Sequence, residues 1–358
     1  MTLPSTIGEF ERVAQESLAP GPLAYYDGGA CDELTLADNL AAWRRLAIRP
    51  RMLVGVAERD CSTTLLGRER EHPLIVAPMA FQAMAAPEGE RATARAAAAT
   101  ATPFCLSTLA TVGVQELAAA APDATRWFQL YVFRDRGVTR ELVAAAGEHG
   151  YEALVVTVDL PVFGVRDSLL RTGWTVDPEL AVPSASAAGT RGPIGPAEVS
   201  ELIDPSLDWS DIERFVAETD LPVVLKGILT AEDARRAAAC GVAAIVVSNH
   251  GGRQLDTVLS GADALPAVVE EVSAQLDVLV DGGIRRGTDV LKALALGASA
   301  VLVGRPLLWG LAVAGEQGAR RVLELLLGEL DVALALAGAP NARELDASWL
   351  MPAPWASH

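Results

Sequence analysis

The sequence predicts a TIM barrel, a closed ring of eight parallel strands in which a helix follows each strand. Eight short apolar runs recur along the 358 residues, and several consist almost entirely of Val, Ile and Leu. Such runs are typical of parallel strands that are buried on both faces. Segments of helix-forming residues separate the runs. Eight such units within about 250 residues are characteristic of this fold.

The predicted strands follow one another at residues 74–79, 104–108, 127–132, 153–159, 222–227, 244–249, 277–283 and 300–305. Two of the helices between them have clear boundaries. Residues 230–239 begin with the capping box of Thr230 and Asp233. Residues 288–296 end at Gly297, which is a typical C-cap. A doubly wound open sheet is the alternative, but no G-x-G-x-x-G pattern follows any strand.

We expect residues 1–358 to form a single domain, with a helical cap at residues 1–70 and the barrel at 71–340. One long irregular connection, residues 175–205, follows the fourth strand and contains Pro178, Pro183, Pro193, Pro196 and Pro205. Loops of this length are usually functional or mobile. We predict a lid over the active face, and a disordered insertion is an equally good interpretation. The last eight residues predict a loose tail.

Composition excludes several function classes. The net charge of −17 disfavours nucleic-acid binding, which needs a basic surface. The start of the chain has no basic flank and no apolar core, so it is not a signal peptide. No uninterrupted apolar run could span a bilayer. The four cysteines are scattered without metal-ligand or CxxC spacing. We therefore expect a cytoplasmic protein that binds no metal, membrane or nucleic acid.

Catalytic residues of TIM barrels lie at the carboxyl ends of the strands. The sixth predicted strand ends in the run SNHGGR at residues 248–253. Of the four histidines, only His250 lies where a general base would be useful, since His72 precedes a proline, His149 ends a helix and His358 is the last residue. His250 is therefore the candidate base.

Lysine is rare, and Lys226 and Lys292 are the two in the chain. Lys292 lies within the helix predicted at residues 288–296. Lys226 closes an apolar strand, where a charge is costly unless it has an anionic partner. A structural ion pair is one interpretation. A functional cation is another, and in a non-redox aldolase or isomerase Lys226 would form a Schiff base.

Glycines and arginines follow the last two strands, with Gly282, Gly283 and Arg285 after the seventh and Gly304 and Arg305 after the eighth. Barrels commonly bind a phosphate at this place. Backbone N–H groups and guanidinium groups suit a phosphate dianion. The strand ends thus predict a phosphorylated cofactor and an anionic substrate on one face.

With these residues assembled, the chain resembles the FMN-dependent 2-hydroxy-acid oxidase and dehydrogenase family over nearly its whole length. The resemblance rests on SNHGGRQLD at residues 248–256, DGGIRRGTDV at 281–290, PEGE at 87–90 and KGILTAEDA at 226–234. Glycolate, lactate and mandelate oxidases belong to this family. In residue pattern and length the chain is most similar to 4-hydroxymandelate oxidase.

The resemblance implies a role for each site residue. His250 would be the base and Asp159 would support its protonated form. Arg166 and Arg253 would hold the substrate carboxylate, with help from Tyr25 and Tyr131, and Tyr131 and Arg253 would also take part in catalysis. The residues implied to bind FMN are Pro78, Met79, Ala80, Ser107, Gln129, Thr157, Lys226, Ser248, Asp281, Gly282, Gly283, Arg285, Gly304 and Arg305.

The implied reaction is the FMN-dependent oxidation of an (S)-2-hydroxy acid to the 2-oxo acid, with O2 reduced to H2O2. Glycolate oxidases have a tryptophan where this chain has Leu109, which would leave room for a substrate such as mandelate or 4-hydroxymandelate, oxidised to the benzoylformate. A small or aliphatic 2-hydroxy acid, such as lactate or glycolate, is the alternative, and a non-redox barrel is a further one. The family also implies a homo-oligomer, a tetramer or an octamer.

Overall fold

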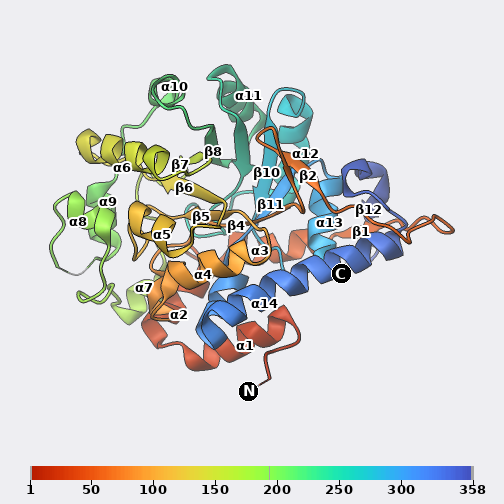
Figure 1. Cartoon of the computed structure of the whole chain (residues 1–358), viewed down its shortest axis with the longest axis horizontal. Coiled ribbons are helices and arrows are strands. Elements are labelled where there is room, and N and C mark those ends of the chain that lie inside the picture. The colour runs from red at the N-terminus through yellow and green to blue at the C-terminus, as the bar shows by residue number, and fades with distance from the viewer. Residues whose placement is uncertain (1, 193, 356–358) are drawn as a thin grey trace.

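The computed structural model describes residues 2–192 and 194–355. Eight parallel strands close into a barrel (Figure 1), which confirms the predicted TIM barrel. Each predicted run overlaps one strand of the barrel. The strands are β4 (Leu74–Val76), β5 (Phe104–Leu106), β6 (Arg126–Leu130), β7 (Leu154–Thr157), β8 (Val223–Ile228), β9 (Ala244–Val247), β10 (Asp277–Asp281) and β11 (Ala300–Val303).

A ring of helices surrounds the barrel, one after each strand. These are α4 (Gly89–Ala98), α5 (Val114–Ala120), α6 (Arg136–Glu148), α10 (Trp209–Glu218), α11 (Ala231–Ala239), α12 (Gly261–Val272), α13 (Gly287–Ala295) and α14 (Arg305–Ala337). Half of the predicted capping box of α11 is present, since the Thr230 side chain accepts a hydrogen bond from the Asp233 backbone N–H. Gly297 follows α13 with a φ of 97°, as expected at a helix end.

The barrel strands are buried on both faces, which explains why their sequences are continuously apolar. One set of side chains fills the barrel interior, including those of Ile75, Cys105, Trp127, Val155 and Leu279. The intervening residues pack outward against the helices in a second, larger core. A polar residue within such a strand therefore has no route to solvent except at the strand ends.

The N-terminal segment covers the barrel with α1 (Ile7–Ser17), α2 (Pro20–Asp27), α3 (Leu34–Arg44) and β1 (Leu46–Ile48). A hairpin of β2 (Thr63–Leu65) and β3 (Arg68–Arg70) closes the barrel at the amino ends of its strands. Leu65 is buried in the barrel interior, and the Leu66 N–H donates to the Asp277 carboxylate at 2.7 Å. The long element α14, whose backbone is kinked at Ala314 and Gly315, lies against α1 and α4 (Figure 1).

The prediction of a loose tail is wrong for the part of the tail that is described. The strand β12 (Leu350–Pro352) pairs antiparallel with β1, and the Trp355 indole N–H donates to the Arg44 carbonyl at 3.1 Å. Residues 356–358 lie outside the described residues. Pairing with a strand some 300 residues earlier leaves no local signal in the sequence, so the tail could not be assigned from its own composition.

The segment at 175–205 is more regular than expected. It follows α7 (Asp167–Thr172) and contains α8 (Pro183–Ala187) and α9 (Pro196–Leu202), which form a group at one side of the barrel in Figure 1. Pro183 and Pro196 begin these helices instead of breaking them, because proline suits the first helical turn. Pro193 lies outside the described residues. The segment packs inward through the buried Val182 and Val199. Its role as a lid stays a prediction.

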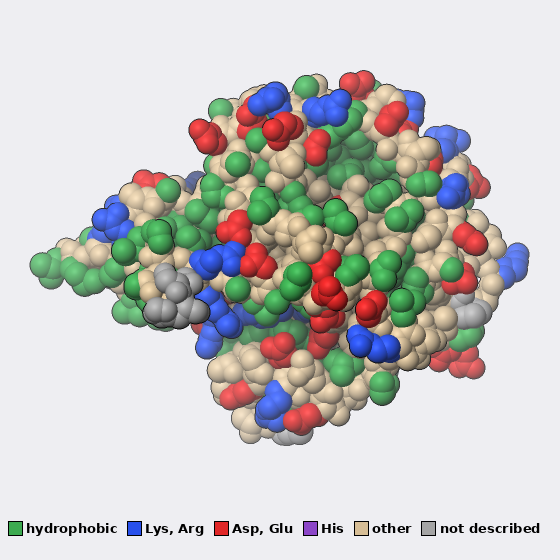
Figure 2. Space-filling view, turned by 180° about the vertical axis from the view of Figure 1, so that it is seen from behind, with side chains coloured by type: hydrophobic (Ala, Val, Ile, Leu, Met, Phe, Trp, Pro, Cys, Tyr) green, Lys and Arg blue, Asp and Glu red, His purple; other side chains and the backbone are tan. Residues whose placement is uncertain are grey.

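The surface carries both signs of charge, interspersed with apolar and uncharged side chains on the face shown in Figure 2. Within residues 2–192 and 194–355, no helix has the length and apolar character needed to cross a membrane. The same residues contain no cluster of three or more His, Cys, Asp or Glu side chains suited to a metal ion.

Candidate active site

A cavity of about 1040 Å³, measured with its open mouth, lies at the carboxyl ends of the barrel strands. All the site residues predicted from the sequence line this cavity except Asp159 and Ser248. Those two lie directly behind it, where Asp159 contacts His250 and Ser248 contacts Lys226. The structure thus brings together every predicted site residue, while their individual roles stay predictions.

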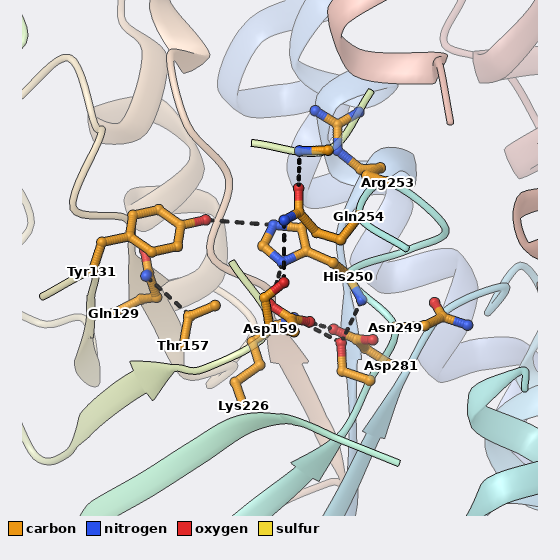
Figure 3. Close-up of polar contacts among 12 residues, drawn as sticks. Gln129, Tyr131, Thr157, Asp159, Lys226, Asn249, His250, Arg253, Gln254 and Asp281 are labelled. Atoms are coloured by element: carbon orange, nitrogen blue, oxygen red, sulfur yellow. Dashed lines mark hydrogen bonds and ion pairs between the residues drawn. The ribbon is translucent and has the colours of Figure 1, made fainter. Parts of the chain in front are cut away.

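His250 stands at the end of β9 between two partners (Figure 3). Its Nδ1 lies 2.8 Å from Asp159 Oδ1, and its Nε2 lies 3.4 Å from the Tyr131 hydroxyl. Because a carboxylate can only accept, Nδ1 carries the proton and Nε2 is left free to take one. His250 has a φ of 58°, a left-handed conformation that is unusual for a non-glycine residue. Such strain is often found at functional sites.

Burial lowers the pKa of His250, and the cations Lys226 and Arg166 act in the same direction. The Asp159 carboxylate opposes this shift only in part. Burial by itself would raise the pKa of Asp159, but the His250 charge and hydrogen bond, together with Lys226, hold that pKa below its usual value. The pair is therefore arranged as a neutral imidazole with a carboxylate behind it, which suits a general base.

Lys226 is a buried cation within β8, two residues before the strand ends at Ile228. Its Nζ lies 3.0 Å from Asp281 Oδ2 and donates to Ser248 Oγ at 2.8 Å. Burial would lower its pKa, yet the Asp281 and Asp159 carboxylates raise that pKa above the usual value. A Schiff-base lysine needs the opposite, a lowered pKa. The charged state of Lys226 therefore disfavours the aldolase or isomerase alternative.

Four arginines line the same cavity: Arg166, Arg253, Arg285 and Arg305. Burial, reinforced by the neighbouring Arg253, lowers the pKa of Arg166 to about 9. Burial and the adjacent Arg253 and Arg285 lower the pKa of Arg305 to about 9 as well. Cations held this close in a desolvated place favour anionic ligands strongly. In a chain with net charge −17, this concentration of positive charge marks the binding face.

The carboxyl end of α2 is held in the site by two of these arginines. Arg253 Nη1 donates to the carbonyls of Tyr25, Tyr26 and Gly28 at 2.6–3.2 Å. Arg305 donates to the Tyr26 and Gly28 carbonyls and to Gly251. Carbonyls at a helix end are natural partners for cations. These bonds place Tyr25 at the cavity, although α2 lies far from the barrel strands in sequence.

Comparison with known proteins agrees with this site. The family model of the FMN-dependent dehydrogenases matches residues 14–352. The chain belongs to this family. An L-lactate oxidase of Nostoc sp. is 46% identical over 97% of this chain and 98% of its own length. The human 2-hydroxyacid oxidase 1 is 44% identical over 98% of this chain and 97% of its own length.

Solved structures of family members have the same fold. A mandelate oxidase with (S)-4-hydroxymandelic acid superposes with a TM-score of 0.91 at 42% identity, covering 98% of this chain and 99% of that structure. A soluble mutant of the membrane-associated (S)-mandelate dehydrogenase from Pseudomonas putida has a TM-score of 0.90 at 34% identity, covering 97% and 99%. The protein is therefore an FMN-dependent enzyme that oxidises 2-hydroxy acids.

The residues present fit FMN. Asp281 Oδ1 is buried and has no hydrogen-bond partner in the part of the chain that the structure describes. Gly283 has a φ of 78°, and a Cβ there would collide with the Asn39 carbonyl, so only glycine allows this turn beside the cavity. The turn at 282–283, with Arg285 and Arg305, would hold the phosphate. Gln129, Thr157 and Lys226 would contact the ring.

The sequence did not predict the apolar wall of the cavity. Leu160, Phe163 and Val199 line it together with the predicted Leu109. Leu160 and Phe163 follow β7, and Val199 lies on α9 in the segment predicted to be a lid. The position of that segment after the fourth strand was the available signal. Hydrophobic residues in a connecting loop do not by themselves show which cavity they face.

Proposed function

We propose that this protein oxidises an aromatic 2-hydroxy acid, mandelate or 4-hydroxymandelate, to the corresponding benzoylformate, and that O2 accepts the electrons and becomes H2O2. The observation that carries the substrate class is the apolar wall of Leu109, Leu160, Phe163 and Val199. An aromatic side chain gains from contact with such a surface, whereas glycolate has no side chain to place there. The similarity to mandelate oxidase, at 42% identity, supports the same choice.

The reaction removes two electrons and two protons from the substrate carbinol. FMN, when bound, would supply the redox chemistry by accepting the two electrons and one of the two protons. Arg166 would bind the carboxylate through Nη1, which is buried and has no partner within residues 2–192 and 194–355. Binding there orients the substrate, and orientation of this kind removes much of the entropic cost of reaction.

His250 would take a proton from the substrate at Nε2. As the ring becomes a cation, Asp159 Oδ1, 2.8 Å from Nδ1, stabilises the new charge. The Tyr131 hydroxyl lies within reach of the same Nε2 and can donate to a substrate oxygen. Burial raises the pKa of Tyr131, so the phenol stays protonated and acts as a donor.

A small aliphatic 2-hydroxy acid is the second candidate substrate, because the L-lactate oxidase of Nostoc sp. is 46% identical to this chain. The two candidates are separated by mixing the FMN-loaded protein anaerobically with (S)-mandelate, (S)-4-hydroxymandelate, L-lactate and glycolate and recording flavin bleaching. We expect the aromatic acids to give the highest ratio of the rate constant for flavin reduction to Kd. Faster reduction by lactate or glycolate would reject the aromatic proposal.

The electron acceptor is tested by then admitting air to the reduced protein. Formation of H2O2 in an amount equal to that of the reduced flavin supports O2 as the acceptor.

We also propose that the protein is a homo-oligomer, a tetramer or an octamer. Met52, Leu53 and Val54 are exposed on the loop after β1, and Leu336 is exposed near the end of α14. The Arg51 N–H donates to the Ala337 carbonyl, so the two apolar groups are neighbours. The apolar projection at the left of Figure 2 agrees with them. Exposed patches of this kind are typical of interfaces. Light scattering that shows a monomer would reject the proposal.

The cytoplasmic location expected from the sequence stays a prediction.

A further inference from the structure

Gln254 is part of the run SNHGGRQLD, and its side chain uses its full hydrogen-bonding capacity within the active site. Its Nε2 donates to the carbonyls of Asp159 and Val162 at 3.1 and 3.0 Å. Its Oε1 accepts from the Gly164 N–H at 3.1 Å and from Arg166 Nη2 at 3.3 Å. A primary amide has two donor hydrogens and two acceptor lone pairs, and here all four have partners. Figure 3 shows this side chain next to His250 and Asp159.

The four partners lie on one segment, the loop between β7 and α7, whereas Gln254 lies on the loop after β9. The two loops approach very closely at Gly164. A Cβ on Gly164 would lie 2.7 Å from the Arg253 carbonyl oxygen and 2.8 Å from Gln254 Cα, so a larger residue would force the loops apart. The amide of Gln254 therefore joins two loops whose separation is already fixed by glycine.

The consequence for Arg166 follows from the planar shape of its guanidinium group. Its Nε donates to the Arg253 carbonyl at 3.0 Å and its Nη2 donates to Gln254 Oε1. With two nitrogens fixed, the direction of the third is determined, because the guanidinium is a rigid fork. The third, Nη1, is the buried atom that has no partner among the described residues. Residues 253 and 254 thus set the direction in which Arg166 offers its free donor.

The consequence for His250 follows from Asp159. Gln254 holds the Asp159 carbonyl, and the Asp159 carboxylate holds His250 Nδ1. The same amide therefore fixes the carboxylate-binding arginine on one side and the support of the base on the other. A leucine has nearly the same size as glutamine but could make neither set of bonds.

We propose that Gln254 is a positioning residue for the oxidation of the 2-hydroxy acid, acting through Arg166 on the substrate carboxylate and through Asp159 on the base. The proposal rests on the class of reaction and not on the side chain of the substrate.

The binding half is tested with oxalate, a carboxylate without a side chain, titrated into the FMN-loaded protein and followed by the flavin absorbance. We expect Gln254→Leu to weaken oxalate about 2- to 10-fold, the equivalent of one hydrogen bond. In an Arg166→Leu background the same substitution should change the Kd by less than about twofold, because the residue through which it acts is gone. Equal weakening in both backgrounds, or no weakening in the wild type, overturns the binding half.

The catalytic half is tested by the rate of flavin reduction at saturating 2-hydroxy acid, for whichever acid of the substrate panel reacts. Gln254→Leu should slow flavin reduction in the otherwise wild-type protein. In an Asp159→Asn background the same substitution should cause little further loss of rate. An additive effect overturns the catalytic half. Because oxalate binding does not depend on which acid the enzyme oxidises, failure of the aromatic-substrate proposal leaves the binding test unaffected.

Two further variants serve as an alternative to Gln254→Leu and as its control. Gln254→Glu keeps the acceptor oxygen and nearly the same shape, so it serves if Gln254→Leu does not fold. The new carboxylate of Gln254→Glu would compete with oxalate for Arg166 and so weaken oxalate binding. In the Arg166→Leu background, Gln254→Glu should no longer weaken oxalate binding. Gln275→Leu is the matched control, since Gln275 is exposed just before β10 at the opposite end of the barrel. It should leave oxalate binding and flavin reduction unchanged. If it weakens oxalate as much as Gln254→Leu does, the proposal is overturned.

Discussion

Asp159 and His250 come from loops 91 residues apart in the sequence, yet Asp159 Oδ1 lies 2.8 Å from His250 Nδ1. The left-handed backbone at His250, with a φ of 58°, accompanies a ring that has Asp159 on one side and Tyr131 on the other. This relationship leaves Nε2 as the proton-accepting atom of the site. The first two predictions depend on it.

Replacing His250 with alanine should leave FMN binding intact and slow flavin reduction by the substrate about 10²- to 10⁴-fold, the usual contribution of a positioned base. Anaerobic stopped-flow mixing measures the rate, and the absorbance of the purified protein reports the bound FMN. Reduction at a near-normal rate would remove His250 from the mechanism.

The pH dependence of flavin reduction should have an acidic limb below the ordinary histidine pKa of about 6.5. Burial and the cations Lys226 and Arg166 lower the pKa of His250, and Asp159 opposes them. The base form is present above that pKa, so activity is retained at neutral pH and is lost as the pH falls through the lowered value. Asp159→Asn removes the opposing carboxylate and should move the limb to still lower pH. A limb above 6.5 would contradict this arrangement.

Replacing Arg166 with leucine should mainly weaken binding of the substrate carboxylate. A hydrogen bond to a charged group contributes about 1.5–3 kcal/mol, so KM should rise roughly 10-fold or more. Steady-state kinetics with the best acid of the panel checks this. Loss of FMN together with an unchanged KM in the remaining holoenzyme would assign Arg166 to the cofactor instead.

Replacing Lys226 with methionine should destabilise the protein. It leaves the Asp281 carboxylate buried without its cation, 3.0 Å from the former Nζ. Removing one partner of a buried ion pair costs about 3–5 kcal/mol. Chemical unfolding of the FMN-free protein measures this without any effect of the cofactor. Lys226→Met combined with Asp281→Leu should recover part of the loss, and a double variant that is less stable than the single one would contradict the pairing.

Replacing Leu109 with tryptophan should narrow the cavity and shift preference from mandelate toward glycolate. Pocket shape discriminates between side chains by roughly 10-fold or more in kcat/KM. Leu109→Met keeps the volume and should leave the ratio of kcat/KM for mandelate and glycolate nearly unchanged. If both variants keep the wild-type ratio, Leu109 does not set the substrate class.

Much of the fold could be predicted from the sequence because parallel barrel strands are buried on both faces and so read as continuous apolar runs. The ends of β8, β9, β10 and β11 could be found for the same reason, since Lys226, His250, Asp281 and Arg305 interrupt or follow such runs. The helices α8 and α9 were missed because their prolines resemble loop punctuation, although Pro183 and Pro196 lie at helix starts.

By itself the sequence determined which residues lie at the carboxyl ends of the strands, and therefore which side chains share one face. Only the tertiary structure decided how partners from distant segments meet there. Tyr25 is brought to the cavity by arginines that bind the end of α2, and Gln254 meets Asp159 and Arg166 across two loops. The physical reason is that burial is recorded in local hydrophobic patterns, whereas hydrogen bonds between segments depend on distances that exist only after the barrel has closed.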